Sequence, residues 1–281
     1  MTEEIFKLSD GTRTRLRIEV PADRPAKAVV QYIHGFSEHA TYAAVTALAD
    51  FYTANGYVFV VHDQRGHGTM PGLTAKERWH KFGKVARYQD FVNDAASVRR
   101  EIAVRFPDLP LILHGLSMGG NIALQMQLEN RELPYEKVIL ESPWLGLSHP
   151  FPWAFEKLTF ALRETLPQLT VGTNRGLTEI ASHHFQTDPL FHGRISVGLY
   201  RMMEDQAQKI LAQADKLTKP ILLIVADGDT VVSSAQEEKL AALTGDNLTM
   251  VEFHEKHHVI HHKNPSSAQV YQAILDFLSA D

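Results

Sequence analysis

The sequence predicts an α/β fold with a mostly parallel central sheet, helices on both of its faces and one inserted helical segment. Short apolar runs alternate with helical patterns along most of the 281 residues, which is the order expected of strands and crossover helices. The alternation stops once, between Trp144 and about Lys219, and then resumes. Because the strand runs are apolar throughout, we expect both faces of the sheet to be covered.

The amino-terminal half supplies most of the predicted sheet. Residues 5–20 alternate apolar and polar side chains around Asp10-Gly11, which predicts an antiparallel hairpin. Apolar runs that predict buried strands follow at 28–33, 57–61, 111–113 and 138–140. Helical patterns lie between them at 42–54, 88–106 and 117–130.

The same order of elements resumes after Pro220. The predicted elements are a strand at 221–225, a helix at 235–243, a strand at 248–253 and a final helix at 266–278. We therefore assign residues 1–143 and 216–281 to one α/β core and residues 144–215 to a helical cap subdomain. Such an insertion is expected at the carboxyl ends of the strands, where α/β folds bind their ligands.

Composition limits the classes of function. Hydrophobic residues make up 44% and charged residues 22%, as in a soluble globular protein, and the net charge of -5 gives no reason to expect a nucleic-acid partner. The chain has no cysteine, which excludes disulfides, a thiolate nucleophile and a cysteine-based zinc site. With neither a signal-peptide pattern nor a long apolar run, we expect a cytoplasmic protein without cofactor or metal. The oligomeric state is left open.

A nucleophile motif lies between a predicted strand and a predicted helix. Gly115-Leu116-Ser117-Met118-Gly119 matches the G-x-S-x-G pattern, in which a sharp strand-to-helix turn projects the serine hydroxyl above the sheet. Glycines on both sides let the neighbouring backbone approach without a Cβ clash. The alternative is a serine that only caps the helix in a glycine-rich turn, which would not explain the acid and histidine candidates that follow it in the chain. We therefore predict that Ser117 is a catalytic nucleophile.

A serine nucleophile needs a base and an orienting carboxylate, which follow it in the order acid, then histidine. The strand at 221–226 leads directly into Asp227-Gly228-Asp229, and Asp229 precedes the apolar pair that re-enters the fold. We prefer Asp229 as the acid. Asp227, which has the sequence of a turn, and the more distant Glu141 are the alternatives.

The base is expected after the last strand, where histidines are abundant. We prefer His258 and keep His257 as the alternative, because spacing along the chain does not separate the two. The candidates are His254, His257, His258, His261 and His262.

Three motifs together resemble the monoacylglycerol lipase and lysophospholipase branch of the α/β-hydrolases, a group of the serine aminopeptidase type. The resemblance extends over nearly the whole chain and includes Asp188-Pro189-Leu190 in the cap region. The motifs are His34-Gly35-Phe36-Ser37-Glu38-His39, Asp63-Gln64-Arg65-Gly66-His67-Gly68 and His114-Gly115-Leu116-Ser117-Met118-Gly119-Gly120.

The resemblance implies roles for individual residues. The catalytic aspartate of the family falls on Asp229, and its histidine falls on His258. The oxyanion hole falls on the backbone amides of Phe36 and Met118. The expected activity is hydrolysis of a small acyl ester, such as a monoacylglycerol or lysophospholipid, through an acyl-enzyme. A peptidase or an acyltransferase with the same triad, and a non-catalytic ligand-binding protein, are the alternatives.

Other polar motifs have simpler explanations. His34 and His67 are expected to position the oxyanion loop, and Arg65 to be a structural charge partner. His254-Glu255-Lys256-His257-His258 formally matches the H-E-x-x-H zinc signature. That chemistry needs both histidines on one helical face, whereas residues 249–253 alternate as a strand, so we do not expect a zinc site.

The apolar side chains of the predicted cap are the candidates for contact with the substrate. Phe151, Phe155, Leu158 and Leu162 share one face of a predicted helix, while Trp153 and Phe160 lie on another. One apolar face is enough to dock the cap, so the second is expected to cover an acyl pocket or to make transient contact with a membrane surface. The alternative is that both faces are packed inside the cap. The predicted substrate-binding residues of the cap are Phe151, Trp153, Phe155 and Phe160.

Overall fold

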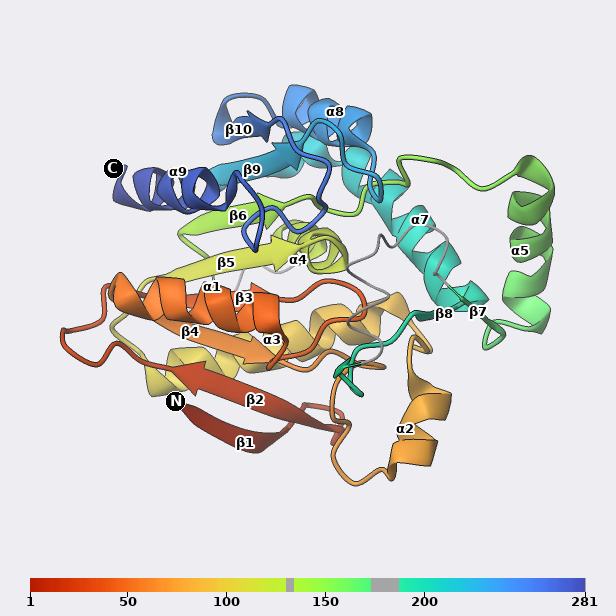
Figure 1. Cartoon of the computed structure of the whole chain (residues 1–281), viewed down its shortest axis with the longest axis horizontal. Coiled ribbons are helices and arrows are strands. Elements are labelled where there is room, and N and C mark those ends of the chain that lie inside the picture. Colours follow the sequence, from red (N-terminus) through yellow and green to blue (C-terminus); the bar gives the residue numbers. More distant parts are fainter. Residues whose placement is uncertain (130–133, 173–186, 281) are drawn as a thin grey trace.

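A central eight-stranded sheet organises the computed structural model, which describes residues 1–129, 134–172 and 187–280 (Figure 1). The strand order is β1-β2-β4-β3-β5-β6-β9-β10. These strands are β1 (Thr2–Lys7), β2 (Arg13–Glu19), β3 (Ala28–Ile33), β4 (Tyr57–His62), β5 (Leu111–Leu116), β6 (Lys137–Glu141), β9 (Ile221–Ala226) and β10 (Leu248–Phe253). The helices are α1 (Ala43–Ala54), α2 (Ala75–Lys81), α3 (Tyr88–Arg105), α4 (Met118–Glu129), α5 (Trp153–Thr165), α7 (Val197–Leu211), α8 (Ser234–Thr244) and α9 (Ser267–Ser279).

The sheet is mostly parallel, as predicted. Strands β1 and β2 form the antiparallel hairpin, and β2 pairs antiparallel with β4. From β4 to β10 every neighbouring pair is parallel. The carboxyl ends of these six strands therefore meet at one edge, where loops from distant parts of the chain converge.

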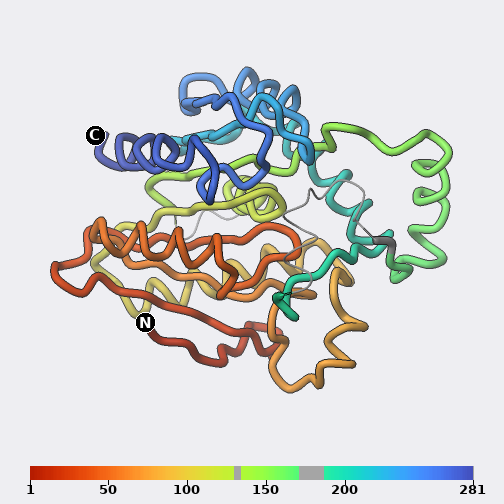
Figure 2. Tube along the Cα trace, in the orientation of Figure 1, coloured from red at the N-terminus to blue at the C-terminus, as the bar shows by residue number. Residues whose placement is uncertain are grey.

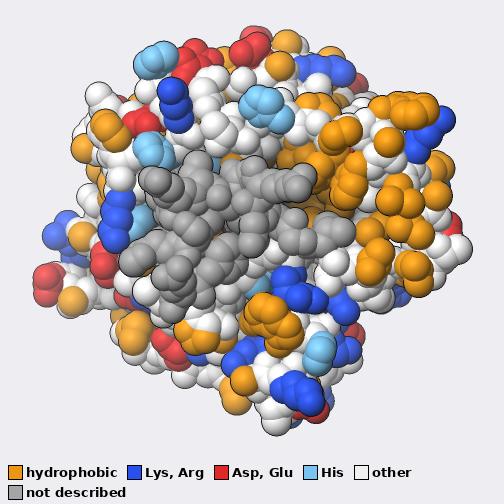
Figure 3. Space-filling view, turned by 45° about the vertical axis from the view of Figure 1, so that its right-hand side comes forward, with side chains coloured by type: hydrophobic (Ala, Val, Ile, Leu, Met, Phe, Trp, Pro, Cys, Tyr) orange, Lys and Arg blue, Asp and Glu red, His pale blue; other side chains and the backbone are white. Residues whose placement is uncertain are grey.

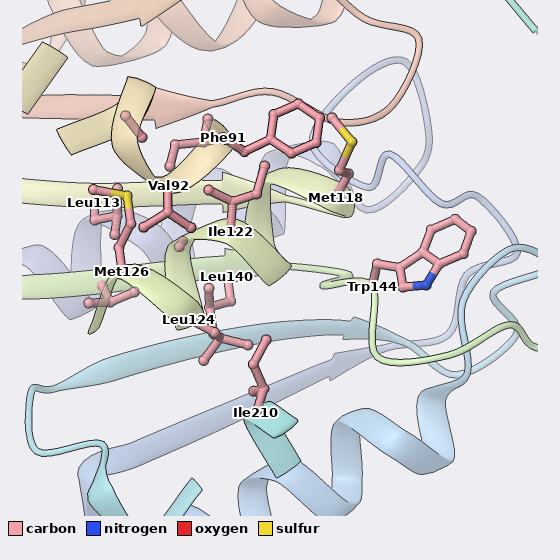
Figure 4. Packing of buried hydrophobic residues seen from close by; sticks show 14 of the residues in the cluster. Phe91, Val92, Leu113, Met118, Ile122, Leu124, Met126, Leu140, Trp144 and Ile210 are labelled. Carbon is pink, nitrogen blue, oxygen red and sulfur yellow. The ribbon is translucent and has the colours of Figure 1, made fainter. Parts of the chain in front are cut away.

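Helices cover both faces of the sheet, and alternate strand residues supply the two cores. On β3, Val30 and Tyr32 join α1 and α9 in one buried cluster, while Val29 and Ile33 join α3, α4 and α8 in the other. Figure 4 shows the second cluster, in which side chains of α3 and α4 interdigitate with those of the strands. Its labelled members are Phe91, Val92, Leu113, Met118, Ile122, Leu124, Met126, Leu140, Trp144 and Ile210. The prediction that both faces are covered is confirmed.

The cap segment follows β6, and its described residues, 144–172 and 187–215, add no strand to the main sheet. Figures 1 and 2 show α5 standing apart at the edge of the molecule where the parallel strands end, while both chain termini lie at the opposite side. Helix α7 belongs to both parts, since Leu199, Met203 and Ile210 pack into the core cluster of α3 and α4. The division at residues 144 and 216 remains a proposal.

Short elements depart from the expectations. No strand was predicted in the cap, yet β7 (Thr170–Gly172) and β8 (Arg194–Ser196) pair antiparallel. Strands of three residues are too short to show an alternating pattern. Helix α2 was not predicted either; it begins with a capping box formed by Thr74 and Glu77. No helix in the described ranges is long and apolar enough to cross a bilayer.

Candidate active site

Ser117 occupies the sharp turn between β5 and α4. Its φ of 53° lies in the left-handed region, which costs a non-glycine residue about 1–3 kcal/mol. Three backbone hydrogen bonds hold this conformation: the Ser117 amide donates to the Glu141 carbonyl at 3.0 Å, and the Ser117 carbonyl accepts from Asn121 at 3.0 Å and Trp144 at 2.9 Å. The turn is therefore fixed by its neighbours, and these lie on α4 and just beyond β6.

The two glycines of the motif are required by close backbone contacts. A Cβ atom on Gly115 would lie 2.5 Å from the Gly119 carbonyl oxygen. A Cβ atom on Gly119 would lie 1.9 Å from the Ile33 carbonyl oxygen. The second contact also shows that the chain leaving β3 passes directly against the nucleophile turn, which brings the following loop to the site.

The loop after β3 carries the first expected oxyanion amide, and α4 begins with the second. Neither the Phe36 amide nor the Met118 amide donates to another residue in the described ranges. Glu38 holds the loop, since its Oε2 accepts a hydrogen bond of 2.8 Å from the Gly35 amide. Burial raises the pKa of Glu38 to about 7. Two unbonded amides are what a developing oxyanion requires.

Asp229 and His258 meet across the loops that follow β9 and β10. His258 Nδ1 lies 2.7 Å from Asp229 Oδ2, and the amides of Val231 and Val232 donate to Asp229 Oδ1 at 2.6 and 3.1 Å. Burial alone would raise the pKa of Asp229, but the charge of His258 and these hydrogen bonds lower it. Burial alone would lower the pKa of His258, but Asp229 outweighs it and the pKa is raised.

The remaining carboxylate candidates have other partners. Asp227 pairs at 2.6 Å with His254, whose side chain is 99% exposed. Glu141 is buried and pairs with His261 at 2.7 Å. His257 lies 3.1 Å from Glu255. Of the predicted acid–base combinations, the structure therefore brings together Asp229 and His258.

The H-E-x-x-H pattern does not form the helix that the zinc signature requires. In the part of the chain that the structure describes, which includes residues 254–258, no group of three or more His, Cys, Asp or Glu side chains could hold a metal ion. The pattern follows strand β10 and is not helical, so its histidines do not share a helical face.

His34, His67 and Arg65 have structural partners. His34 Nδ1 donates to the Gly35 carbonyl at 2.8 Å, and its Nε2 accepts from the Gln64 amide at 3.0 Å. Burial lowers the pKa of both His34 and His67 to about 3, so both rings are neutral at physiological pH. Arg65 pairs with Asp94 at 2.6 Å. These contacts fix the loops around the site.

The cap side chains contact one another. Phe151 packs on Phe155, with ring centroids 4.5 Å apart. Trp153 and Phe160 are 70% and 55% exposed, and Leu158, expected on the docking face, is 54% exposed. Thr159 is the buried residue of α5, because polar contacts to α7 hold the helix in place of an apolar stripe. The expected docking face is therefore wrong at Leu158.

Several polar residues near the site were not given a role by the sequence. His39 Nε2 lies 2.8 Å from Asp188 Oδ2, which joins the oxyanion loop to the cap. Glu38 and His39 lie within the first motif and Asp188 within the Asp-Pro-Leu sequence. The motifs therefore mark these residues, but the sequence does not show which side chains they contact. Glu141 and His261 were considered only as catalytic candidates.

The topology settles the class of protein. A parallel sheet preceded by an antiparallel hairpin, with a strained serine at the end of β5 and a cap inserted after β6, is the α/β-hydrolase fold. Residues 24–265 match the profile of the family described as serine aminopeptidase, S33. Because the match extends over most of the sequence, the chain belongs to this family, and the predicted resemblance is confirmed.

Curated relatives have names of lipid-ester hydrolases. Phospholipase YtpA of Bacillus subtilis (strain 168) is 28% identical over 213 residues, which cover 74% of this chain and 77% of the relative. Monoglyceride lipase of Mus musculus is 27% identical over 267 residues, covering 92% and 83%. Among solved structures, a soluble variant of monoglyceride lipase from Saccharomyces cerevisiae with a substrate analogue superposes with a TM-score of 0.82 at 20% identity, covering 99% and 94%. The last comparison supports the fold alone.

Proposed function

We propose that the chain is a serine carboxylester hydrolase that cleaves monoacylglycerols, lysophospholipids or similar acyl esters. The observation that carries the proposal is the Asp229–His258 pair, in which Nδ1 is bonded at 2.7 Å and Nε2 has no partner among the described residues. A base needs this free nitrogen. The relatives named as lipases and as a phospholipase support an ester substrate.

The proposed mechanism uses residues of four loops. His258 Nε2 accepts the proton of Ser117 Oγ as the oxygen attacks the ester carbonyl carbon, and Asp229 stabilises the resulting imidazolium. The amides of Phe36 and Met118 donate to the oxyanion. The C–O bond to the alcohol then breaks, and His258 returns its proton to the leaving oxygen. Water then attacks the acyl carbonyl carbon as His258 takes its proton. The bond from this carbon to Ser117 Oγ breaks, His258 returns the proton to Ser117 Oγ, and the acid is released.

A labelling experiment tests the nucleophile. A fluorophosphonate should label the wild-type chain at Ser117, and Ser117→Ala should abolish labelling and lower kcat by about 10⁶-fold with the fold retained. Circular dichroism controls for folding. Labelling of the Ser117→Ala variant at the wild-type rate would refute the assignment.

The substrate class is tested separately. p-Nitrophenyl esters of increasing chain length, assayed beside a monoacylglycerol and an amino-acid anilide, should show the highest kcat/KM for acyl esters. The family description as an aminopeptidase makes the anilide the informative competitor. A higher kcat/KM for the anilide would identify a peptidase.

We further propose that the cap receives acyl chains and contacts lipid surfaces. Apolar side chains gather on the side of the molecule where α5 lies (Figure 3). Lys157 Nζ lies 4.0 Å from the Trp153 ring centroid and the Arg163 guanidinium 4.0 Å from that of Phe160, so cations accompany both exposed rings. Aromatic and basic side chains together are typical of helices that lie on membrane surfaces.

Trp153→Ala tests the role of the cap, and Val104→Ala is its control because Val104 is 77% exposed but lies near the end of α3, a helix of the α/β core. Trp153→Ala should lower the ratio of long-chain to short-chain kcat/KM by about tenfold and weaken sedimentation with phospholipid vesicles, whereas Val104→Ala should change neither. An unchanged ratio together with unchanged sedimentation would contradict the proposal for the cap.

A cytoplasmic location is also part of the proposal. Its support is the absence of cysteine from a chain of 281 residues, which suits a reducing compartment.

A further inference from the structure

Glu141 ends strand β6 directly beside the nucleophile turn. Its backbone carbonyl accepts the Ser117 amide at 3.0 Å, and its side chain is fully buried. Glu141 therefore connects Ser117, through its backbone carbonyl, to any group that its carboxylate binds.

The carboxylate of Glu141 holds the loop that carries His258. Its Oε1 accepts the amides of Ile260 and His261 at 2.6 and 3.0 Å, and its Oε2 lies 2.7 Å from His261 Nδ1. All three donors belong to Ile260 and His261, which lie two and three residues after His258 in the chain. The loop between β10 and α9 is thus attached to the end of β6 at this point.

His261 balances the buried charge of Glu141. Its Nε2 lies 3.2 Å from the Ala44 carbonyl, which only accepts, so both ring nitrogens face acceptors and both carry protons. Burial lowers the pKa of His261 by itself, but the charge and hydrogen bonds of Glu141 outweigh burial and raise it. The pKa of Glu141 is lowered, because His261 outweighs its burial. The two side chains form a satisfied ion pair.

A direct catalytic role for this pair conflicts with its contacts. His261 is 1% exposed, and neither of its nitrogens is free to accept a proton from a serine. Glu141 contacts His261 and not His258, so it does not orient the free imidazole. Burying two charges is costly compared with an apolar contact of the same size, so the pair is expected to serve position more than stability.

We propose that Glu141 is a positioning residue that sets the separation of Ser117 and His258 by holding the His258 loop against the nucleophile turn. The inference rests on the proposed function, since it takes Ser117 and His258 as the nucleophile and base. We expect the length of the Glu141 side chain (its reach), and not its charge, to be the property that matters for catalysis.

Two substitutions separate reach from charge. Glu141→Asp keeps the charge and shortens the side chain by one methylene, which displaces the loop by on the order of 1 Å, and a displacement of this size typically costs about 100-fold in rate. Glu141→Gln keeps the reach: its carbonyl still accepts from Ile260 and His261, and its NH₂ donates to Nδ1 of a neutral His261. We expect Glu141→Asp to lower kcat about 100-fold with KM within about threefold, and Glu141→Gln to stay within about fivefold of wild type in kcat.

Glu255 provides the matched control. It lies in the same loop, but its carboxylate bonds Ser266 at 2.9 Å and His257 at 3.1 Å and contacts no residue of the nucleophile turn. Glu255→Asp should therefore change kcat less than about threefold. All rates are measured with a p-nitrophenyl ester and normalised to active sites counted by the fluorophosphonate burst, so that unfolded molecules do not contribute.

The outcomes are distinct. Wild-type kcat in Glu141→Asp, or a lower kcat in Glu141→Gln than in Glu141→Asp, would overturn the inference. If Glu141→Asp does not fold, Glu141→Gln remains decisive, because a loss of about tenfold or more there would show that charge matters. If the wild-type chain neither reacts with the fluorophosphonate nor hydrolyses an ester, the proposed function itself fails, whatever the Glu141 variants do.

Discussion

Two histidines of the loop after β10, His258 and His261, each pair with a buried carboxylate from another part of the chain, and the two pairs differ at the second ring nitrogen. His258 with Asp229 and His261 with Glu141 have the same Nδ1–oxygen distance of 2.7 Å, and in both pairs the partner raises the pKa of the histidine. The Nε2 atom of His258 has no partner among the described residues, whereas that of His261 donates to the Ala44 carbonyl.

The difference teaches that the second ring nitrogen decides the role of such a pair. A base must accept a proton, and a ring with both nitrogens bonded to acceptors has no lone pair to offer. The free nitrogen of His258 is retained for the reaction at the cost of an unsatisfied buried group. His261 is saturated, so its pair stabilises the loop on which His258 is carried.

Within this comparison of histidine–carboxylate pairs, the largest expected effect concerns Asp229. Asp229→Asn should lower kcat by about 10⁴-fold, because an amide favours the wrong tautomer of His258 and does not stabilise the imidazolium. Steady-state ester hydrolysis measures it. Asp227→Asn is the control, since its carboxylate lies on the surface with His254, and it should keep wild-type kcat. Equal losses in the two variants would erase the distinction between these aspartates.

Stability should distinguish the buried Glu141–His261 pair from the proposed catalytic pair, Asp229 with His258. Glu141→Ala leaves three buried donors without an acceptor and His261 without a counterion, and should lower the free energy of unfolding by about 3–5 kcal/mol. Urea unfolding followed by circular dichroism measures this change. A loss below about 1 kcal/mol would mean that water or a neighbouring side chain replaces the carboxylate.

The next prediction concerns the pH dependence of kcat/KM, which should reflect the protonation of His258. Only neutral His258 can accept the Ser117 proton, and its pKa is raised, so kcat/KM should fall as pH decreases, with a midpoint above the usual value of about 6.5. Residual activity of Asp229→Asn should show this limb at lower pH, because the carboxylate that raises the pKa is gone. A flat profile between about pH 5 and 8 would contradict the assignment of His258 as base.

The smallest effect is expected for the third pair, Asp227 with His254. Its 2.6 Å separation resembles that of the other two, but His254 is fully in solvent, where water screens the interaction. His254→Ala should leave kcat unchanged and shift Tm by less than about 1 °C in a thermal scan. A larger shift in Tm would show that a short distance between histidine and carboxylate stabilises the protein even when the pair is exposed to solvent.

The sequence by itself predicted the order of the main-sheet strands along the chain, the larger helices of the core and the turn that carries the proposed nucleophile, Ser117. These features depend mainly on local properties: apolar runs and helical periodicity extend over neighbouring residues, and a Cβ atom on Gly115 would lie 2.5 Å from the Gly119 carbonyl oxygen. The glycine at 119 is required by a distant residue, since its Cβ atom would lie 1.9 Å from the Ile33 carbonyl oxygen. The oxyanion loop was also predictable through its motif, although the role of Glu38 in holding it was not.

The tertiary structure alone decided which carboxylate each histidine meets and which face of the cap helix is buried. Five histidines lie within nine irregular residues, where no periodicity sets the direction of a side chain. The carboxylate partners of His254, His258 and His261 come from the end of β6 and the loop after β9, far away in sequence. On α5, contacts with α7 bury Thr159 and leave Leu158 in solvent, against the apolar pattern. Pairings of this kind depend on where the sheet brings distant loops together, and a linear sequence carries that information only through the complete fold.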